Sequence, residues 1–191
     1  MLQTEREIDG RRSALIKMAG LCGLALSGDA LAALAAAGKT PAVAGLLSAD
    51  ALALTGVLAE HIIPATDTPG ALAVGAHRTI DHMLLACATT PEQQGFLAGL
   101  ARVDAVALAE TGKRFRALPS TRRVALLHAL DGGTAPFNAE DQHFFRRLKS
   151  YTLFAYYTSE AGSTRELAYL PVPGGYQGNF PLRKNTRTWA I

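Results

Sequence analysis

The stretch of residues 138–162 constrains the fold of this chain most, because its sequence marks both ends of one long helix. Asn138 can cap the first turn, and Asp141 three residues later completes an approximate capping box. Gly162 is a natural stop, because glycine adopts the left-handed backbone conformation without a Cβ clash. Between these marks an apolar stripe recurs at helical spacing, too wide for a lone surface helix. The stripe comprises Phe144, Phe145, Leu148, Tyr151, Thr152, Ala155, Tyr156 and Ser159.

Aromatic residues are concentrated in the same helix. The chain has only five tyrosines and seven phenylalanines, and half of them lie between positions 144 and 157. Large aromatic side chains dominate core packing, so the core is predicted to form around this long central helix. Two interpretations of the stripe stay open. It serves the core alone, or the part near Tyr156 and Tyr157 faces another protein.

The rest of the chain up to about residue 170 carries further helical patterns and no long alternation of period two. Ser48 and Thr90 are predicted helix caps, and Gln93 is predicted to return the bond to Thr90. The prediction is an all-α fold with a single helical domain, which suits the length of 191 residues and the 49% hydrophobic content. The other predicted helices span residues 48–63, 76–88, 90–111 and 121–130. Between the first two, residues 64–70 form a loop in which Asp67 can bond backbone amides.

The first forty residues have the build of a secretory signal. Arg11 and Arg12 precede an uncharged apolar run over residues 18–27, and small residues follow it. The arginine pair resembles a twin-arginine export signal, so residues 1–40 are predicted to be a signal helix and residues 41–191 the helical domain. A membrane anchor is a weaker interpretation, because the uncharged run is shorter than the roughly 20 residues that span a bilayer. An amphipathic helix that stays on the protein is the other alternative.

The chain changes character at about residue 170. The remaining segment contains three prolines at positions 171, 173 and 181 and is predicted to be an irregular C-terminal tail. Its aromatic residues Tyr176, Phe180 and Trp189 are apolar enough to need a surface. The tail therefore either wraps its own domain or lies on a partner.

Cysteine usage leaves one thiol in the predicted exported domain. Cys22 lies in the signal segment, so Cys87 stands alone in residues 41–191. A single thiol in an oxidising compartment is either buried and inert or paired with another chain. The buried state is the favoured interpretation, and an intersubunit disulfide at Cys87 is the alternative.

The sequence offers no catalytic, cofactor-binding or metal-binding constellation. It lacks a glycine-rich nucleotide loop in the required context, a haem-attachment motif and a cysteine cluster. The pair Glu140 and His143 has the spacing that di-iron bundles use, but no second such pair is present, and acids in a first helical turn are ordinary. A formal net charge of +3 does not support nucleic-acid binding.

Several stretches resemble the gluconate 2-dehydrogenase subunit 3 family. The run LAEHIIPATDTPGA at residues 58–71, with Gly75 and Ile80-Asp81, is similar to the front of that family. Residues 144–153, 157–160 and 171–178 are similar to its back, so the likeness covers nearly the whole chain. The resemblance implies a non-catalytic small subunit of a periplasmic, flavin-dependent sugar or polyol dehydrogenase.

The same resemblance implies partners and a role. FAD is expected in a large subunit, and haem c in a cytochrome c subunit that often receives the electrons. The small subunit resembles an escort that carries the export signal for the large subunit through the twin-arginine machinery and stays bound. Partner contacts are then expected at Tyr156, Tyr157, Tyr176, Phe180 and Trp189. The alternatives are an assembly factor that dissociates after export and a free-standing helical metalloenzyme.

Overall fold

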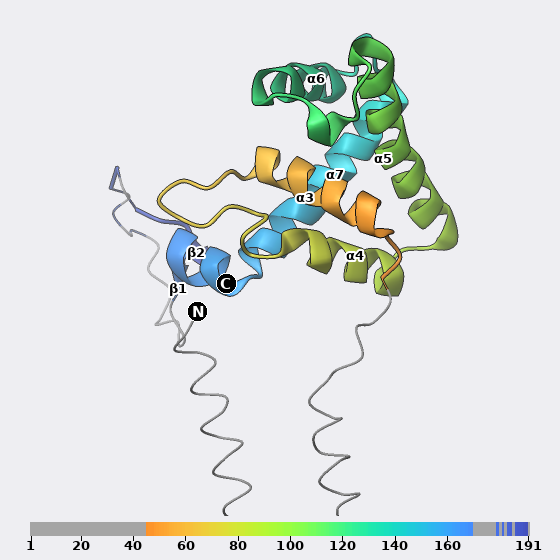
Figure 1. Ribbon diagram of the computed structural model, residues 1–191. Coiled ribbons are helices and arrows are strands. Elements are labelled where there is room, and N and C mark those ends of the chain that lie inside the picture. The colour runs from red at the N-terminus through yellow and green to blue at the C-terminus, as the bar shows by residue number, and fades with distance from the viewer. Residues whose placement is uncertain (1–44, 170–178, 180, 182, 185, 191) are drawn as a thin grey trace, which may run out of the picture. The chain divides into compact units, whose positions relative to one another are not determined.

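The computed structural model describes residues 45–169, 179, 181, 183–184 and 186–190 (Figure 1). The predicted signal segment with Arg11 and Arg12 lies outside the described residues, and so do Tyr176 and Phe180 of the tail. All described residues belong to one compact unit, Gly45–Ile191.

Most of the described residues are helical, as predicted. The α-helices are α3 (Ala49–Ile62), α4 (Ala76–Cys87), α5 (Thr90–Thr111), α6 (Ser120–Gly132) and α7 (Ala139–Tyr157). A 3₁₀ turn, η1 (Phe115–Ala117), precedes α6, and a π-helical turn, η2 (Gly162–Glu166), follows α7. The departure from the all-α prediction is a pair of two-residue strands. In this pair β1 (Ala168–Tyr169) lies parallel to β2 (Trp189–Ala190).

The prediction that the long helix organises the core is confirmed. α7 packs against α3, α4, α5 and α6, and η2 lies beyond its C-terminal end (Figure 1). Phe96 of α5 packs edge-on against Phe144, with 5.3 Å between ring centroids. Helical periodicity places the apolar stripe on the buried side of α7. The buried residues of the helix are Phe144, Phe145, Leu148, Thr152, Ala155 and Tyr156.

The predicted start of α7 is confirmed in atomic detail. The Asn138 side chain accepts hydrogen bonds from the backbone N–H groups of Glu140 and Asp141, at 2.9 and 3.0 Å. The Asp141 carboxylate accepts the Asn138 N–H in return, at 3.1 Å. This reciprocal pair satisfies donors that the first turn cannot pair internally.

The predicted end of α7 is wrong. The helix ends at Tyr157, five residues before Gly162, and Gly162 does not adopt a left-handed conformation. A Cβ at Gly162 would lie 2.0 Å from the Tyr156 carbonyl oxygen. Glycine is therefore needed here because η2 passes close to the end of α7, and not because the helix stops there.

The predicted cap of α5 is displaced by one residue. The capping residue is Thr89, whose backbone N–H and hydroxyl both donate to the Glu92 carboxylate at 2.8 Å. Gln93 instead donates from its side-chain amide to the Leu84 and Ala88 carbonyls. It therefore closes the end of α4, while Glu92 closes the start of α5. The predicted Ser48 cap of α3 is confirmed by a 3.3 Å bond from the Ala51 N–H.

Candidate docking surface

The C-terminal half of α7 exposes three large apolar side chains on one face. Leu153, Phe154 and Tyr157 have exposed fractions of 44%, 56% and 37%. Thr152 and Ala155 of the same helix are buried on the opposite face, as the helical period requires. Single exposed apolar side chains are ordinary, but three of this size on adjacent turns form a surface suited to another protein.

Two more exposed aromatic residues lie on the strands that follow η2. Tyr169 on β1 has an exposed fraction of 57%, and Trp189 on β2 has one of 45%. The strands are held in register with Ala168 opposite Trp189, beside η2 and beyond the C-terminal end of α7 (Figure 1). We call the five exposed residues Leu153, Phe154, Tyr157, Tyr169 and Trp189 the α7 end surface.

The two adjacent tyrosines, which the sequence analysis assigned to one partner-facing surface, lie in different environments. Tyr157 is exposed, but Tyr156 has an exposed fraction of only 1% and lies in the core of its own chain. Its hydroxyl donates to the Pro69 carbonyl at 2.9 Å and lies 3.3 Å from the Thr68 hydroxyl. The assignment of Tyr156 to the partner-facing surface is therefore corrected, because the side chain ties α7 to the α3–α4 loop.

Both ends of that loop are held by a glutamate of α3. Glu60 accepts the Ala65 N–H at 3.1 Å and the Leu72 N–H at 2.8 Å, through different carboxylate oxygens. Gly70 packs against the same carboxylate, and a Cβ there would lie 2.3 Å from Glu60 Oε1. The sequence had assigned amide bonding in this loop to Asp67. That carboxylate instead accepts the Thr66 hydroxyl at 3.0 Å.

The middle of the loop, at Thr68 and Pro69, is held by η2 and α7 together. The Thr68 hydroxyl donates to the Glu166 carboxylate of η2 at 2.7 Å, beside its contact with Tyr156. A loop of irregular backbone normally bonds to water on the surface, so side chains that satisfy it fix its conformation. The loop and the end of α7 therefore form one connected structure.

Cys87 is exposed, so the interpretation that its thiol is buried is wrong. It is the last residue of α4, where the helical face that buries Ile80 and Leu84 reaches the edge of the core. The alternative, a disulfide to another chain, stays a prediction.

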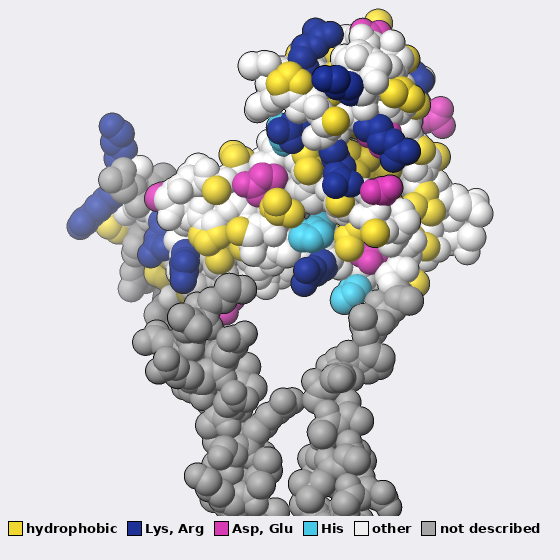
Figure 2. Space-filling model, viewed as in Figure 1, with side chains coloured by type: hydrophobic (Ala, Val, Ile, Leu, Met, Phe, Trp, Pro, Cys, Tyr) yellow, Lys and Arg dark blue, Asp and Glu magenta, His cyan; other side chains and the backbone are white. Residues whose placement is uncertain are grey.

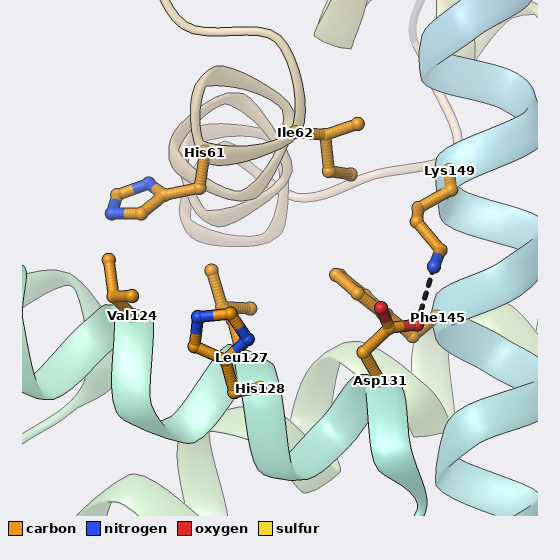
Figure 3. A pocket seen from close by; sticks show the side chains of 8 residues that line it. All are labelled: His61, Ile62, Val124, Leu127, His128, Asp131, Phe145 and Lys149. Carbon is orange, nitrogen blue, oxygen red and sulfur yellow. Dashed lines mark hydrogen bonds and ion pairs between the residues drawn. The ribbon is translucent and has the colours of Figure 1, made fainter.

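A pocket of about 220 Å³ lies between α3, α6 and α7. Figure 3 shows its lining: His61 and Ile62 from α3, Val124, Leu127, His128 and Asp131 from α6, and Phe145 and Lys149 from α7. Its polar groups are already engaged in part, because His61 Nδ1 bonds to the Val57 carbonyl at 2.8 Å and Asp131 pairs with Lys149. Among the described residues no group of three or more His, Cys, Asp or Glu side chains could hold a metal ion.

Positive charge gathers over α6 and the segment before it, and further Lys and Arg side chains lie in the region of η2 and the strands (Figure 2). Residues 113–123 contain five basic side chains and no acidic one. Asp50 pairs with Arg116 at 3.3 Å and with Arg114 at 3.7 Å. These three residues line a second pocket, and Asp104 lines it with them. These carboxylates offset part of the charge, so the segment is a weak attractor of anions at ordinary ionic strength.

No described helix is long and apolar enough to cross a membrane.

A protein-family model described as gluconate 2-dehydrogenase subunit 3 matches residues 49–174. The match begins at the first residue of α3 and extends past β1, so it includes the α3–α4 loop and all of α7. Neither a curated protein nor a solved structure matches the chain.

Proposed function

Because the chain belongs to the gluconate 2-dehydrogenase subunit 3 family, we propose that it is the small subunit of a periplasmic, flavin-dependent sugar or polyol dehydrogenase complex. The family is a non-catalytic subunit, so the chemistry belongs to a partner. The large subunit carries FAD, and a cytochrome c subunit with haem c accepts the electrons. The family match over residues 49–174 is the observation that carries this proposal.

The α7 end surface supports a structural role in such a complex. Its exposed residues include Phe154, Tyr157, Tyr169 and Trp189, and aromatic side chains of this kind anchor protein interfaces. Together with Tyr176 and Phe180 of the tail, Tyr157 and Trp189 contact the large subunit. Cys87 is accessible for a disulfide to the same partner.

The second part of the proposal is export. The Arg11 and Arg12 pair directs this chain to the twin-arginine machinery, which moves folded proteins across the membrane. A large subunit bound to this chain would then reach the periplasm without a signal of its own. The small subunit stays in the complex after export, unlike an assembly factor, which would leave.

Purification from the periplasm tests the proposal. The chain should carry an affinity tag at its C-terminus and be co-expressed with a flavoprotein dehydrogenase as the proposed large subunit. The expected result is a complex of fixed stoichiometry whose flavin and dehydrogenase activity travel with the large subunit, while the isolated chain shows neither. A stoichiometric flavin spectrum from the isolated chain would overturn the proposal. If the large subunit is exported but does not stay bound to this chain, the result would favour the assembly factor.

A further inference from the structure

We propose that residues 64–67, at the tip of the α3–α4 loop, form a preorganised docking element for the large subunit. The tip presents the Asp67 carboxylate to a cationic side chain of that partner, and Tyr156 is the positioning residue that holds it. This inference rests on the proposed function and deepens it, because it adds a second contact region with a stated chemistry.

The first support is the way the base of the loop is fixed. The Ala71 N–H donates to the Ile63 carbonyl at 2.9 Å and closes the loop where it leaves and rejoins the helices. Glu60 accepts the Ala65 N–H within the tip and the Leu72 N–H beyond it. The close packing of Gly70 on the Glu60 carboxylate leaves no room for a side chain there. The base of the loop therefore has one well-defined conformation.

The second support is a buried tyrosine whose polar atom is used only on this loop. The Tyr156 ring is packed in the core, which fixes the position of its hydroxyl. That hydroxyl bonds Pro69 and adjoins Thr68, the two residues that follow the tip. Glu166 completes the arrangement by accepting the Thr68 hydroxyl. A core side chain thus controls the direction in which the tip leaves the domain.

The third support is the chemistry of the tip itself. Residues 64–67 are all exposed, whereas residues 68–70, which follow them, are partly or fully buried. Asp67 carries the single charge of residues 63–71, and within the described part of the chain it forms no ion pair. The Thr66 hydroxyl donates to its carboxylate and limits its rotation. A fixed carboxylate without an internal counter-charge is complementary to an arginine or lysine of a partner.

The fourth support is continuity with the α7 end surface. The Tyr156 ring that holds the loop packs edge-on against the exposed Tyr157 ring, with 5.3 Å between centroids. A partner that covers Tyr157 therefore lies close to the loop. Ordering a free loop during binding costs conformational entropy, and a loop ordered in advance avoids that cost. The large subunit is thus the occupant that the position of the loop favours.

The test measures the affinity of the full chain for the purified large subunit at low and high salt. Asp67→Asn should weaken binding by about tenfold at low salt, mainly through slower association, and the difference should shrink at high salt. Glu110→Gln is the matched control, because Glu110 is also an exposed carboxylate and lies at the end of α5. It should leave affinity unchanged.

A double-mutant cycle separates positioning from general stability. Tyr156→Phe keeps the buried ring and removes the hydroxyl, so it should weaken binding several-fold and speed hydrogen exchange at the loop amides. Its effect on affinity should largely vanish in the Asp67→Asn background, because Tyr156 acts through the placement of Asp67. Tyr151→Phe, at a half-buried tyrosine of the same helix, is the control for losing a hydroxyl.

The outcomes distinguish this inference from the proposed function. If the wild-type chain binds the large subunit and Asp67→Asn binds equally well, the docking element is wrong and the small-subunit role stands. Equal effects of Tyr156→Phe in both backgrounds would overturn the positioning role. If the wild-type chain itself fails to bind the large subunit, the proposed function is wrong, and the docking element that rests on it is wrong as well.

Discussion

At the scale of single residues, Gly99 shows how closely α5 approaches α7. A Cβ at this position would lie 2.2 Å from ring atoms of Phe144, whereas a Cβ at Gly95 of the same helix would meet nothing within 4 Å. Gly99→Ala should therefore destabilise the chain by about 1–3 kcal/mol through overpacking. Gly95→Ala should be neutral or stabilise it by up to about 1 kcal/mol, because alanine favours the helix.

Denaturant unfolding of the two variants checks this prediction. Equal stabilities for Gly99→Ala and Gly95→Ala would show that the ring of Phe144 moves aside without cost. The pair shares one helix and one substitution, so intrinsic helix propensity cancels in the comparison.

The burial of some single residues can be predicted from their spacing in the sequence, and that of others can be known only from the folded structure. The inward direction of Phe144 and Leu148 follows from the helical period and was predicted. The different environments of Tyr156 and Tyr157 were not predicted, because both were assigned to the partner-facing surface although only Tyr156 lies on the stripe. What decides is the position of the α3–α4 loop, which covers the first tyrosine and leaves the second exposed. The exposure of Cys87 depends likewise on where the neighbouring helices end.

At the scale of elements, the start of α5 has a dependence on pH that can be measured. The Thr89 backbone N–H, followed by its hydroxyl, donates to Glu92 and holds the pKa of that carboxyl below its usual value. Because the pKa is lower in the folded chain, the contribution to stability is fully present above the ordinary glutamate pKa of about 4.3. It is lost as pH falls through the lower folded value.

The variant Glu92→Gln isolates this contribution. It should be less stable than the wild type near neutral pH, and the two unfolding free energies should converge as the solution is acidified. Circular dichroism during urea unfolding at several pH values measures the difference. A constant gap between the two chains at all pH values would show that the carboxylate charge has no part in the cap.

Element boundaries were predictable where the local chemistry had one solution. Asn138 and Asp141 could pair in one way, and the predicted cap of α7 is confirmed. Near Thr89 and Thr90 the sequence offered two adjacent threonines, so the cap was misplaced by one residue. The end of α7 was missed because Gly162 is required by a close backbone approach from η2, which has no sequence signature.

At the scale of the whole molecule, export of two subunits is expected to depend on one pair of residues. Replacing Arg11→Lys together with Arg12→Lys should keep this chain and its proposed large subunit in the cytoplasm, since the pair opens the predicted export signal. Fractionation followed by dehydrogenase assays gives the measurement. Normal periplasmic activity from the double variant would show that the large subunit has its own route.

The tail is part of the proposed interface with the large subunit, and deleting residues 171–191 tests that role. The buried core described here runs from Leu47 to Tyr156, and every side chain in it precedes the tail. The described tail residues contact the domain through hydrogen bonds at its surface. In one of them the Ala168 N–H donates to the Thr188 carbonyl at 2.8 Å. The truncated chain should therefore stay helical and unfold cooperatively.

The same truncation should abolish co-purification with the large subunit, because it removes Trp189 and the other tail aromatics, Tyr176 and Phe180. Anchors of this kind are worth about 2 kcal/mol or more each when they are central to an interface. Trp189→Ala in the full chain is the milder comparison, since it keeps the backbone that pairs with β1, and it should weaken binding by about thirtyfold if Trp189 is such an anchor. A truncated chain that unfolds would show instead that the tail completes the domain, and the interface would then have to lie on α7 and its loop alone.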